Sequence, residues 1–329
     1  MFRYPRIRLR RNKKTGWSRD LVAQSNLHKS DLIMPLFVIE GHNVIEVIST
    51  MKGVFRYSID KLIDKVQSLF DDGILAIMLF PCISQDIKSP DGSEALNSNN
   101  LICRAIAAIK KYIPGMGIIA DVALDAYTSH GFDGVLDEDG DVDNDKTIDL
   151  LCKQALLLVQ SGADAIAPSD MMDGRIGIIR DLLESYDHHH TQIFSYAVKF
   201  ASNFYSPFRD AIGSKYNLGI RDKKTYFSDY RNAHEAMLEI ELDISEGADI
   251  IIIKPGMMYL DIIYNAANSF KVPIFAYQVS GEYAMLTNAA EHAIINEKDA
   301  VLEVMCCFKR AGATSIITYY ADRVINWIC

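Results

Sequence analysis

Two lysines each follow a strongly apolar run. Lys254 comes directly after four isoleucines, and Lys199 follows the segment FSYAV. A lysine at the tip of a buried strand is desolvated, which lowers the pKa of its ammonium group, and a second ammonium nearby lowers it further. An amine with a lowered pKa attacks carbonyl carbon and forms a Schiff base. The pair favours carbonyl chemistry over the alternative that each lysine has only a structural carboxylate partner.

Other polar residues also stand where apolar runs end. The carboxylates of DVALDAYTSHGFDG could hold a magnesium ion, bind a substrate amine or move protons, or they could form a solvated loop. The candidates at or just after strand ends are Asp121, Asp125, Ser169, Asp170, Tyr277, Ser280 and Tyr319, and Asp133 lies in the loop that follows Asp125.

Residues 206–226 follow the run that ends at Lys199. They contain several cations among glycines and aromatic residues, which predicts a mobile cationic lid able to bind a carboxylate, with a plain basic surface loop as the alternative. The cations are Arg209, Lys215, Arg221, Lys223 and Lys224.

Eight apolar runs rich in branched residues predict strands that are buried on both faces, as in a parallel sheet. They cover residues 32–39, 74–80, 117–122, 164–168, 192–198, 249–253, 273–279 and 314–319. Helical periodicity lies between them, in residues 59–70, 101–111, 147–160, 233–246 and 301–310. Three of these helices lead into a strand through Gly-Ala, at Gly162, Gly247 and Gly312, which is typical of helix-to-strand loops.

Strands that alternate with helices predict an α/β fold, a TIM (β/α)₈ barrel, over residues 31–329. A doubly wound sheet is the rival, but the sequence has no glycine-rich phosphate loop after an early strand. In a barrel, the carboxyl ends of all strands meet at one face, so the candidate residues should share one site.

Bulk properties exclude several classes of partner. The chain has 329 residues, is 49% hydrophobic and carries a net charge of −9, which argues against nucleic-acid or anionic-membrane binding. No apolar run is long enough to span a membrane, and no signal peptide opens the sequence. The six cysteines are scattered, as expected for reduced thiols in a cytoplasmic protein.

The first nineteen residues depart from this acidic balance, with eight Arg or Lys and no acid. A nucleic-acid tail, a transit peptide and an arm that packs on another subunit are all compatible with this charge. Apolar residues in the same segment slightly favour the arm: Phe2, Tyr4, Ile7, Leu9 and Trp17. We therefore expect an arm over residues 1–30, followed by the barrel.

Long stretches of the sequence resemble the porphobilinogen synthase family, also called δ-aminolevulinate dehydratase. They are DVALDAYTSHGFDG, APSDMMDGRIG, SYAVKFASNFYSPFRDA, IIIIKPGMMYLDI, YQVSGEYAML and KRAGATSIITYY, in the family's order. The resemblance implies a barrel hydro-lyase of heme biosynthesis, which condenses two 5-aminolevulinate molecules into porphobilinogen. It also implies that the basic arm wraps a neighbouring subunit in a dimer, and that dimers build a homo-octamer.

The resemblance also implies roles for the candidate residues. Lys254 would form the Schiff base with the propionyl-side substrate, and Lys199 would hold the acetyl-side substrate. The propionyl-side carboxylate would bind Ser280 and Tyr319, with Tyr277 close by, and the acetyl-side carboxylate would bind Arg209 and Lys223. Asp121, Asp125 and Ser169 would surround the amino groups and assist proton transfer.

Departures from the family pattern concern the metal and one carboxylate contact. Where many members have three zinc-binding cysteines, this chain has Ala123, Asp125 and Asp133, so zinc is not expected and the chain resembles an aspartate-rich, magnesium-associated subgroup. Asp125 and Asp133 could still hold a metal, and a monovalent cation is compatible. Glu239 matches an allosteric magnesium ligand. Phe227 replaces a glutamine that helps to bind the acetyl-side carboxylate.

Two other functions remain as alternatives at this point. One is another Schiff-base aldolase or lyase on the same barrel, although no phosphate-binding glycine pair follows the last two strands. The other is a non-catalytic barrel scaffold, which predicts damaged strand-end residues and finds support only in Phe227.

Overall fold

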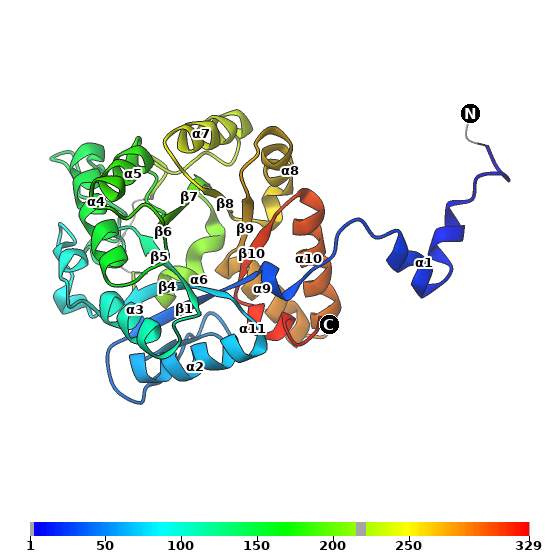
Figure 1. Cartoon of the computed structure of the whole chain (residues 1–329), viewed down its shortest axis with the longest axis horizontal. Helices are drawn as coiled ribbons and strands as arrows, with labels where there is room; N and C mark the ends of the chain where they lie inside the picture. Colours follow the sequence, from blue (N-terminus) through cyan, green and yellow to red (C-terminus); the bar gives the residue numbers. More distant parts are fainter. Residues whose placement is uncertain (1–2, 215–221, 329) are drawn as a thin grey trace.

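The computed structural model describes residues 3–214 and 222–328. Eight parallel strands pair in the order β10-β9-β8-β7-β6-β5-β4-β1, and a pairing between β10 and β1 closes the barrel (Figure 1). The strands are β1 (Leu32–Ile39), β4 (Ala76–Cys82), β5 (Gly117–Val122), β6 (Ala165–Pro168), β7 (Gln192–Lys199), β8 (Ile250–Lys254), β9 (Ile274–Gln278) and β10 (Ser315–Thr318). The predicted TIM barrel and all eight of its predicted strands are confirmed.

A small hairpin was not predicted from the sequence. β2 (Ile45–Val47) pairs antiparallel with β3 (Phe55–Tyr57), and β3 extends the sheet beside the carboxyl end of β1. Both strands have three residues and β2 is exposed, so neither carries the apolar run that marks a barrel strand.

Helices surround the barrel in the intervals between strands (Figure 1). The five predicted helices are α2 (Ile59–Asp72), α3 (Leu101–Tyr112), α4 (Asn144–Gln160), α7 (Ala233–Ser245) and α10 (Glu297–Ala311). The others in the barrel are α5 (Arg175–Ser185), α6 (Ser206–Ala211), α8 (Leu260–Ser269), α9 (Ser280–Glu291) and α11 (Ala321–Val324). Gly162, Gly247 and Gly312 have φ of 110°, 105° and 107°, so each predicted glycine turn is in the left-handed region, which a side chain would disfavour.

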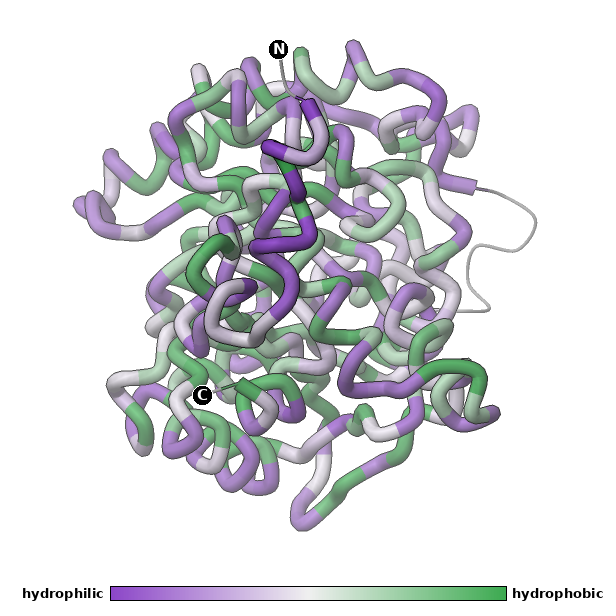
Figure 2. The backbone as a smooth tube through the Cα atoms, turned by 90° about the vertical axis from the view of Figure 1, so that its right-hand side faces the viewer, coloured by the Kyte–Doolittle hydropathy of each residue, from purple (hydrophilic) through white to green (hydrophobic). Residues whose placement is uncertain are grey.

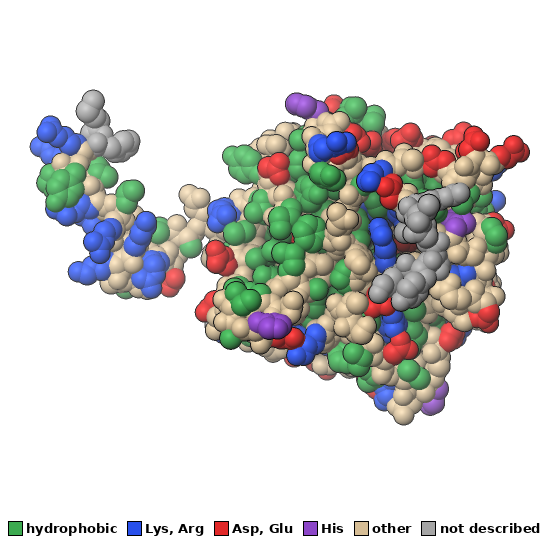
Figure 3. Space-filling model, turned by 180° about the vertical axis from the view of Figure 1, so that it is seen from behind, with side chains coloured by type: hydrophobic (Ala, Val, Ile, Leu, Met, Phe, Trp, Pro, Cys, Tyr) green, Lys and Arg blue, Asp and Glu red, His purple; other side chains and the backbone are tan. Residues whose placement is uncertain are grey.

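The N-terminal segment extends away from the barrel (Figure 1). It contains a 3₁₀ turn, Leu9–Lys13, and α1 (Gly16–Leu21). Figure 2 looks at the molecule from the arm side, where the arm is a largely hydrophilic trace in front of the barrel. Its apolar side chains are nevertheless uncovered, since Leu9 is 73% and Trp17 69% exposed, and Figure 3 shows apolar and basic groups mixed along it.

The barrel strands are almost wholly buried, and all eight residues of β1 are buried. This burial explains why the strands are continuous apolar runs and not alternating ones. Among the described residues, no helix is both long and apolar enough to cross a bilayer.

Candidate active site

A narrow cavity opens at the carboxyl ends of the barrel strands. The structure brings seven of the predicted site residues together around it: Asp121, Asp125, Ser169, Lys199, Arg209, Lys223 and Lys254. Four aromatic side chains complete the lining: Phe80, Tyr205, Phe208 and Phe227. The meeting of residues from five separate strand ends is what a closed barrel predicts.

Lys254 lies in an aromatic cage. Its Nζ is 4.7 to 5.5 Å from the ring centroids of Tyr196, Tyr205, Phe208 and Tyr277. Burial lowers the pKa of its ammonium group to about 7, and the nearby Lys199 ammonium adds to the effect. Aromatic faces stabilise a cation only weakly compared with a carboxylate, so Lys254 is present partly as the neutral amine near pH 7.

Lys199 has a different environment, although it is the neighbour of Lys254. Its ammonium pairs with Asp133 at 3.1 Å and also donates to the backbone oxygen of Ser169. Lys223 joins the same network, at 2.5 Å from Asp133 and 3.3 Å from Asp125. Burial by itself raises the pKa of Asp133, but Lys199 and Lys223 together hold that pKa at about 2.

Asp121 is the acid of the site that can carry a proton. Burial raises the pKa of Asp121 to about 7, and the neighbouring Asp125 carboxylate contributes in the same direction. Its Oδ1 is buried without a hydrogen-bond partner among the described residues. A carboxyl group with this pKa beside an amine of similar pKa is suited to exchange protons with a reacting substrate.

The ring of Phe227 contacts both lysines that pair with Asp133, Lys199 and Lys223. Its ring centroid is 4.4 Å from Lys199 Nζ and 5.5 Å from Lys223 Nζ. The ring is buried and lines the cavity. It therefore contributes cation–π contacts at a position where the family resemblance implies an amide.

Tyr277, Ser280 and Tyr319 are buried beside the cavity and do not belong to its lining. The hydroxyl oxygens of Tyr277 and Tyr319 are 3.3 Å apart. Ser280 Oγ accepts a hydrogen bond from the backbone N–H of Phe208 in α6 at 2.9 Å. A carboxylate that bound at Ser280 would have to compete with this contact.

The predicted lid is only partly within the described residues. Residues 206–211 form α6, whose Arg209 lines the cavity, and Lys224 pairs with Asp222 at 2.6 Å. Lys215 and Arg221 lie outside the described residues. Asp170 is not a cavity residue; it is fully buried, with its carboxylate 3.6 Å from Arg175.

The predicted metal position at Asp125 and Asp133 is surrounded by lysine ammonium groups. Both oxygens of Asp133 face lysine ammonium groups, so Asp125 and Asp133 do not suit a divalent cation while those lysines are protonated. Within residues 3–214 and 222–328, no three His, Cys, Asp or Glu side chains are grouped as a metal site would require.

Glu239 does not line the active-site cavity; it lies in a neighbouring hollow that also contains Asn144, Asp173 and Glu235, and Phe227 lines both spaces. Burial raises the pKa of Glu239 to about 7, and the nearby Asp243 and Asp173 carboxylates add to the shift. The hollow provides carboxylate and amide oxygens, the donor type that magnesium prefers, and the cation Lys224 also lines it.

The aromatic cage of Lys254 was not identified from the sequence. Tyr196, Tyr205 and Phe208 belong to segments of mostly apolar and aromatic residues, where nothing separates a cavity-lining ring from a core ring. Only Tyr277 of the four was selected, because it stands near the end of a predicted strand.

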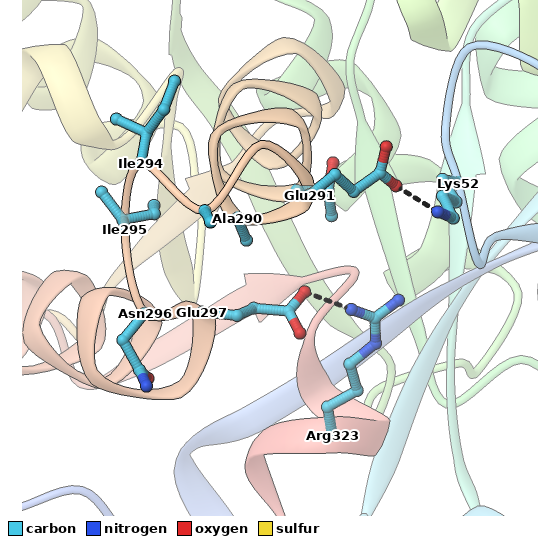
Figure 4. A pocket seen from close by; sticks show the side chains of 10 residues that line it. Lys52, Ala290, Glu291, Ile294, Ile295, Asn296, Glu297 and Arg323 are labelled. Atoms are coloured by element: carbon cyan, nitrogen blue, oxygen red, sulfur yellow. Dashed lines mark hydrogen bonds and ion pairs between the residues drawn. The ribbon is translucent and has the colours of Figure 1, made fainter.

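A second, polar pocket lies away from the strand ends, between α9, α10 and α11 (Figure 4). Its charged side chains are paired with one another, Lys52 with Glu291 at 2.6 Å and Arg323 with Glu297 at 2.5 Å. It has no amine or carboxyl group poised for reaction comparable with Lys254 or Asp121.

Comparison with known proteins identifies the family of the chain. Residues 6–327 match the model of the family described as delta-aminolevulinic acid dehydratase. Relatives named delta-aminolevulinic acid dehydratase include that of Bradyrhizobium diazoefficiens, 48% identical over 317 residues (96% of this chain and 89% of the relative), and that of Chlamydia pneumoniae, 45% identical over 319 residues (97% and 95%).

One solved structure is similar over nearly the whole chain. It is the crystal structure of delta-aminolevulinic acid dehydratase (porphobilinogen synthase) from Toxoplasma gondii ME49 in complex with the reaction product porphobilinogen. It is 46% identical, has a TM-score of 0.95, and the match covers 98% of this chain and 91% of that chain. Sequence and fold thus agree over almost all residues, and the chain belongs to the delta-aminolevulinic acid dehydratase family.

Proposed function

We propose that this chain is a porphobilinogen synthase, which condenses two 5-aminolevulinate molecules into porphobilinogen with release of two waters. The observation that carries the proposal is the pair of adjacent lysines in one cavity, of which Lys254 has a pKa lowered to about 7. Family membership supports this reaction over another Schiff-base lyase. The strand-end residues are intact, which argues against a non-catalytic scaffold.

The first covalent step takes place at Lys254. Its neutral amine attacks the ketone carbon of the propionyl-side substrate, giving a carbinolamine. Asp121, with a pKa of about 7, donates a proton to the departing hydroxyl, which leaves as water while the carbon–nitrogen double bond forms. The product is a protonated Schiff base, and the aromatic cage accommodates its positive charge.

The second substrate would be held from the opposite side of the cavity. Arg209 and Lys223 line the cavity and would provide positive charge for its carboxylate. Lys199 is the nucleophile for the second ketone once its proton passes to a neighbouring group. Asp125 and Ser169 line the same cavity and would contact the substrate amino groups. For the propionyl-side carboxylate we retain Ser280 and Tyr319, with Tyr277 supporting Tyr319 through their hydroxyl contact.

A borohydride trapping experiment tests the assignment. Reduction in the presence of 5-aminolevulinate should leave a covalent adduct on Lys254, located by peptide mass spectrometry. Lys254→Ala should remove this adduct, whereas Lys61→Ala, on the outer helix α2, should not. A folded wild-type protein without an adduct on Lys254 would overturn the proposed function.

For the metal, we propose that magnesium binds at Glu239 and acts from outside the active site. The magnesium ion would neutralise the carboxylates in that hollow and so stabilise the packing of α7 against the segments that line the hollow. We propose no catalytic zinc, because Ala123, Asp125 and Asp133 provide no thiolate. A monovalent cation remains compatible with the family resemblance.

For the assembly, we propose a homo-oligomer, as large as an octamer, in which the arm packs on a neighbouring subunit. The support is the exposure of apolar side chains such as Leu9, Trp17 and Leu21 on a segment that extends from the barrel. An isolated chain would leave these side chains in water, whereas a second subunit would bury them. We place the protein in the cytoplasm, on the basis of the reduced-thiol composition.

A further inference from the structure

Glu282 is a buried carboxylate that the proposed reaction does not use. It is the third residue of α9 and has no exposed surface. It lies in the first turn of the helix, shortly after the end of β9. The helix dipole favours a negative charge there. Burial raises the pKa of Glu282 to about 7, while backbone N–H groups act in the opposite direction.

The two oxygens of Glu282 bond to two different strand exits. Oε2 accepts a hydrogen bond from the backbone N–H of Val279, at the end of β9, at 3.0 Å. Oε1 accepts one from the backbone N–H of Met257, three residues after Lys254, at 2.8 Å. One side chain therefore fixes the separation between the loop that follows Lys254 and the start of α9, where Ser280 lies.

Close packing at Gly256 and at Gly281 keeps the loop after Lys254 and the start of α9 near each other. A Cβ at Gly256 would come within 2.7 Å of the Phe308 ring and 3.1 Å of the backbone oxygen of Tyr277. A Cβ at Gly281 would come within 2.5 Å of the backbone oxygen of Phe204, which lies on the segment after β7. The start of α9 is thus in contact with the exits of β7, β8 and β9 together.

Lys254 needs this backbone support because no hydrogen bond holds its side chain. Among the described residues, its Nζ has aromatic contacts but no hydrogen-bond acceptor or carboxylate partner. Its backbone oxygen accepts hydrogen bonds from the hydroxyl of Tyr205 and the N–H of Phe200, both at 3.0 Å. Its amine is consequently placed by the backbone and by ring packing. A displacement of the reacting group by about 1 Å can lower the rate about 100-fold.

We propose that Glu282 is a positioning residue for the Schiff-base lysine: its carboxylate spans the exits of β8 and β9 and sets the placement of Lys254 relative to Ser280. The inference rests on the proposed function, because its consequence is the rate at which Lys254 reacts. This positioning role requires both oxygens of one carboxylate as acceptors. It also requires a side chain as long as that of glutamate, so that the oxygens reach the two N–H groups.

Two variants separate this role from general stability. Glu282→Gln keeps the shape but replaces one acceptor with an NH₂ group, so only one of the Val279 and Met257 N–H groups can be satisfied. Glu282→Asp keeps the charge but is one methylene shorter. The matched control is Glu291→Gln, at the other end of the same helix, where the carboxylate is paired with Lys52 at the surface.

The measurement is the rate of borohydride-trapped adduct formation on Lys254 at saturating 5-aminolevulinate, together with kcat and KM. We expect both Glu282 variants to lower the trapping rate and kcat by about 10- to 100-fold with little change in KM, and Glu291→Gln to behave as wild type. Far-UV circular dichroism and thermal unfolding show whether each variant is folded.

Several outcomes overturn the inference. A folded Glu282→Gln that traps substrate at the wild-type rate removes the positioning role, and a fully active Glu282→Asp shows that charge alone is needed. If neither variant folds, hydrogen exchange in the wild type decides: the amides of residues 256–258 should exchange as slowly as barrel strands, and fast exchange contradicts the clamp. Absence of any adduct in the wild type would instead refute the proposed function.

Discussion

Lys199 and Lys254 are directly opposite each other, as Cα partners in the pairing of β7 with β8. This placement depends on an irregularity, because the register shifts by one residue between Ser195 and Val198. Tyr196 points into the barrel, where its ring contacts Lys254. Regular alternation would then turn Lys199, three residues later, to the outside, and the extra residue of the bulge returns it to the inside.

The pH dependence of the reaction should follow the amine of Lys254 and the carboxyl group of Asp121. With a pKa lowered to about 7, the amine becomes neutral as pH rises through 7, whereas Asp121, with a pKa raised to about 7, loses the proton that it donates, so kcat/KM should have a maximum near pH 7. The Asp121 carboxylate raises the pKa of Lys254, and Asp121→Asn should therefore move the rising limb to lower pH, remove the falling limb and reduce the maximum. A pH–rate profile of both proteins measures this, and a limb that moves to higher pH in the variant would contradict the electrostatic assignment.

Asp133 should contribute to stability as the shared counter-ion of two buried lysines. Its folded pKa of about 2 lies below its unfolded value of about 4, so its contribution is present above pH 4 and is lost as pH falls toward 2. Asp133→Asn leaves Lys199 and Lys223 without this carboxylate and should cost about 3–5 kcal/mol at pH 7. Urea unfolding measures the difference, which should shrink at acidic pH.

Asp229→Asn is the matched control for this experiment. The pKa of Asp229 is also lowered to about 2, mainly by its hydrogen bond from Arg231, but this pair is exposed to solvent. Removing it should change stability very little, because water screens an exposed pair. Equal losses in the two variants would mean that Asp133 is not acting as a buried counter-ion.

Phe227 offers a test of how the second substrate is bound. Phe227→Gln would exchange two cation–π contacts for an amide that can hydrogen-bond a carboxylate. We expect KM for 5-aminolevulinate to fall by about 10-fold, the effect of one hydrogen bond to a charged group, with a smaller change in kcat. Phe227→Leu, which retains the apolar volume without the ring, serves as the comparison and should not lower KM. Unchanged kinetics in the glutamine variant would place the second carboxylate elsewhere.

Magnesium should act through Glu239. Chelation by EDTA is expected to lower activity, and magnesium, but not zinc, should restore it. Glu239→Ala should weaken this magnesium response while the borohydride adduct on Lys254 still forms, because Glu239 does not line the active-site cavity. Glu241→Ala, two residues along the same helix, is the control. Restoration by zinc alone would overturn the metal assignment.

The sequence was sufficient to predict the barrel and its strand-end chemistry. Each barrel strand is a continuous apolar run, so the polar residue near the end of the run lies at the carboxyl end of the barrel, as Asp121, Lys199 and Lys254 do. The helix ends at Gly162, Gly247 and Gly312 were equally predictable, because only glycine readily adopts their positive φ. In each case, local chain chemistry decides the outcome.

The contacts between distant segments were decided only by the tertiary structure. The one-residue shift in β7, the aromatic cage of Lys254 and the pairing of Asp133 with two lysines depend on which side chains meet across the barrel. Asp133 could be a metal ligand or a counter-ion by sequence alone, since a carboxylate suits both. Its role depends on the charges that surround it, and these come from residues 66 and 90 positions away along the chain.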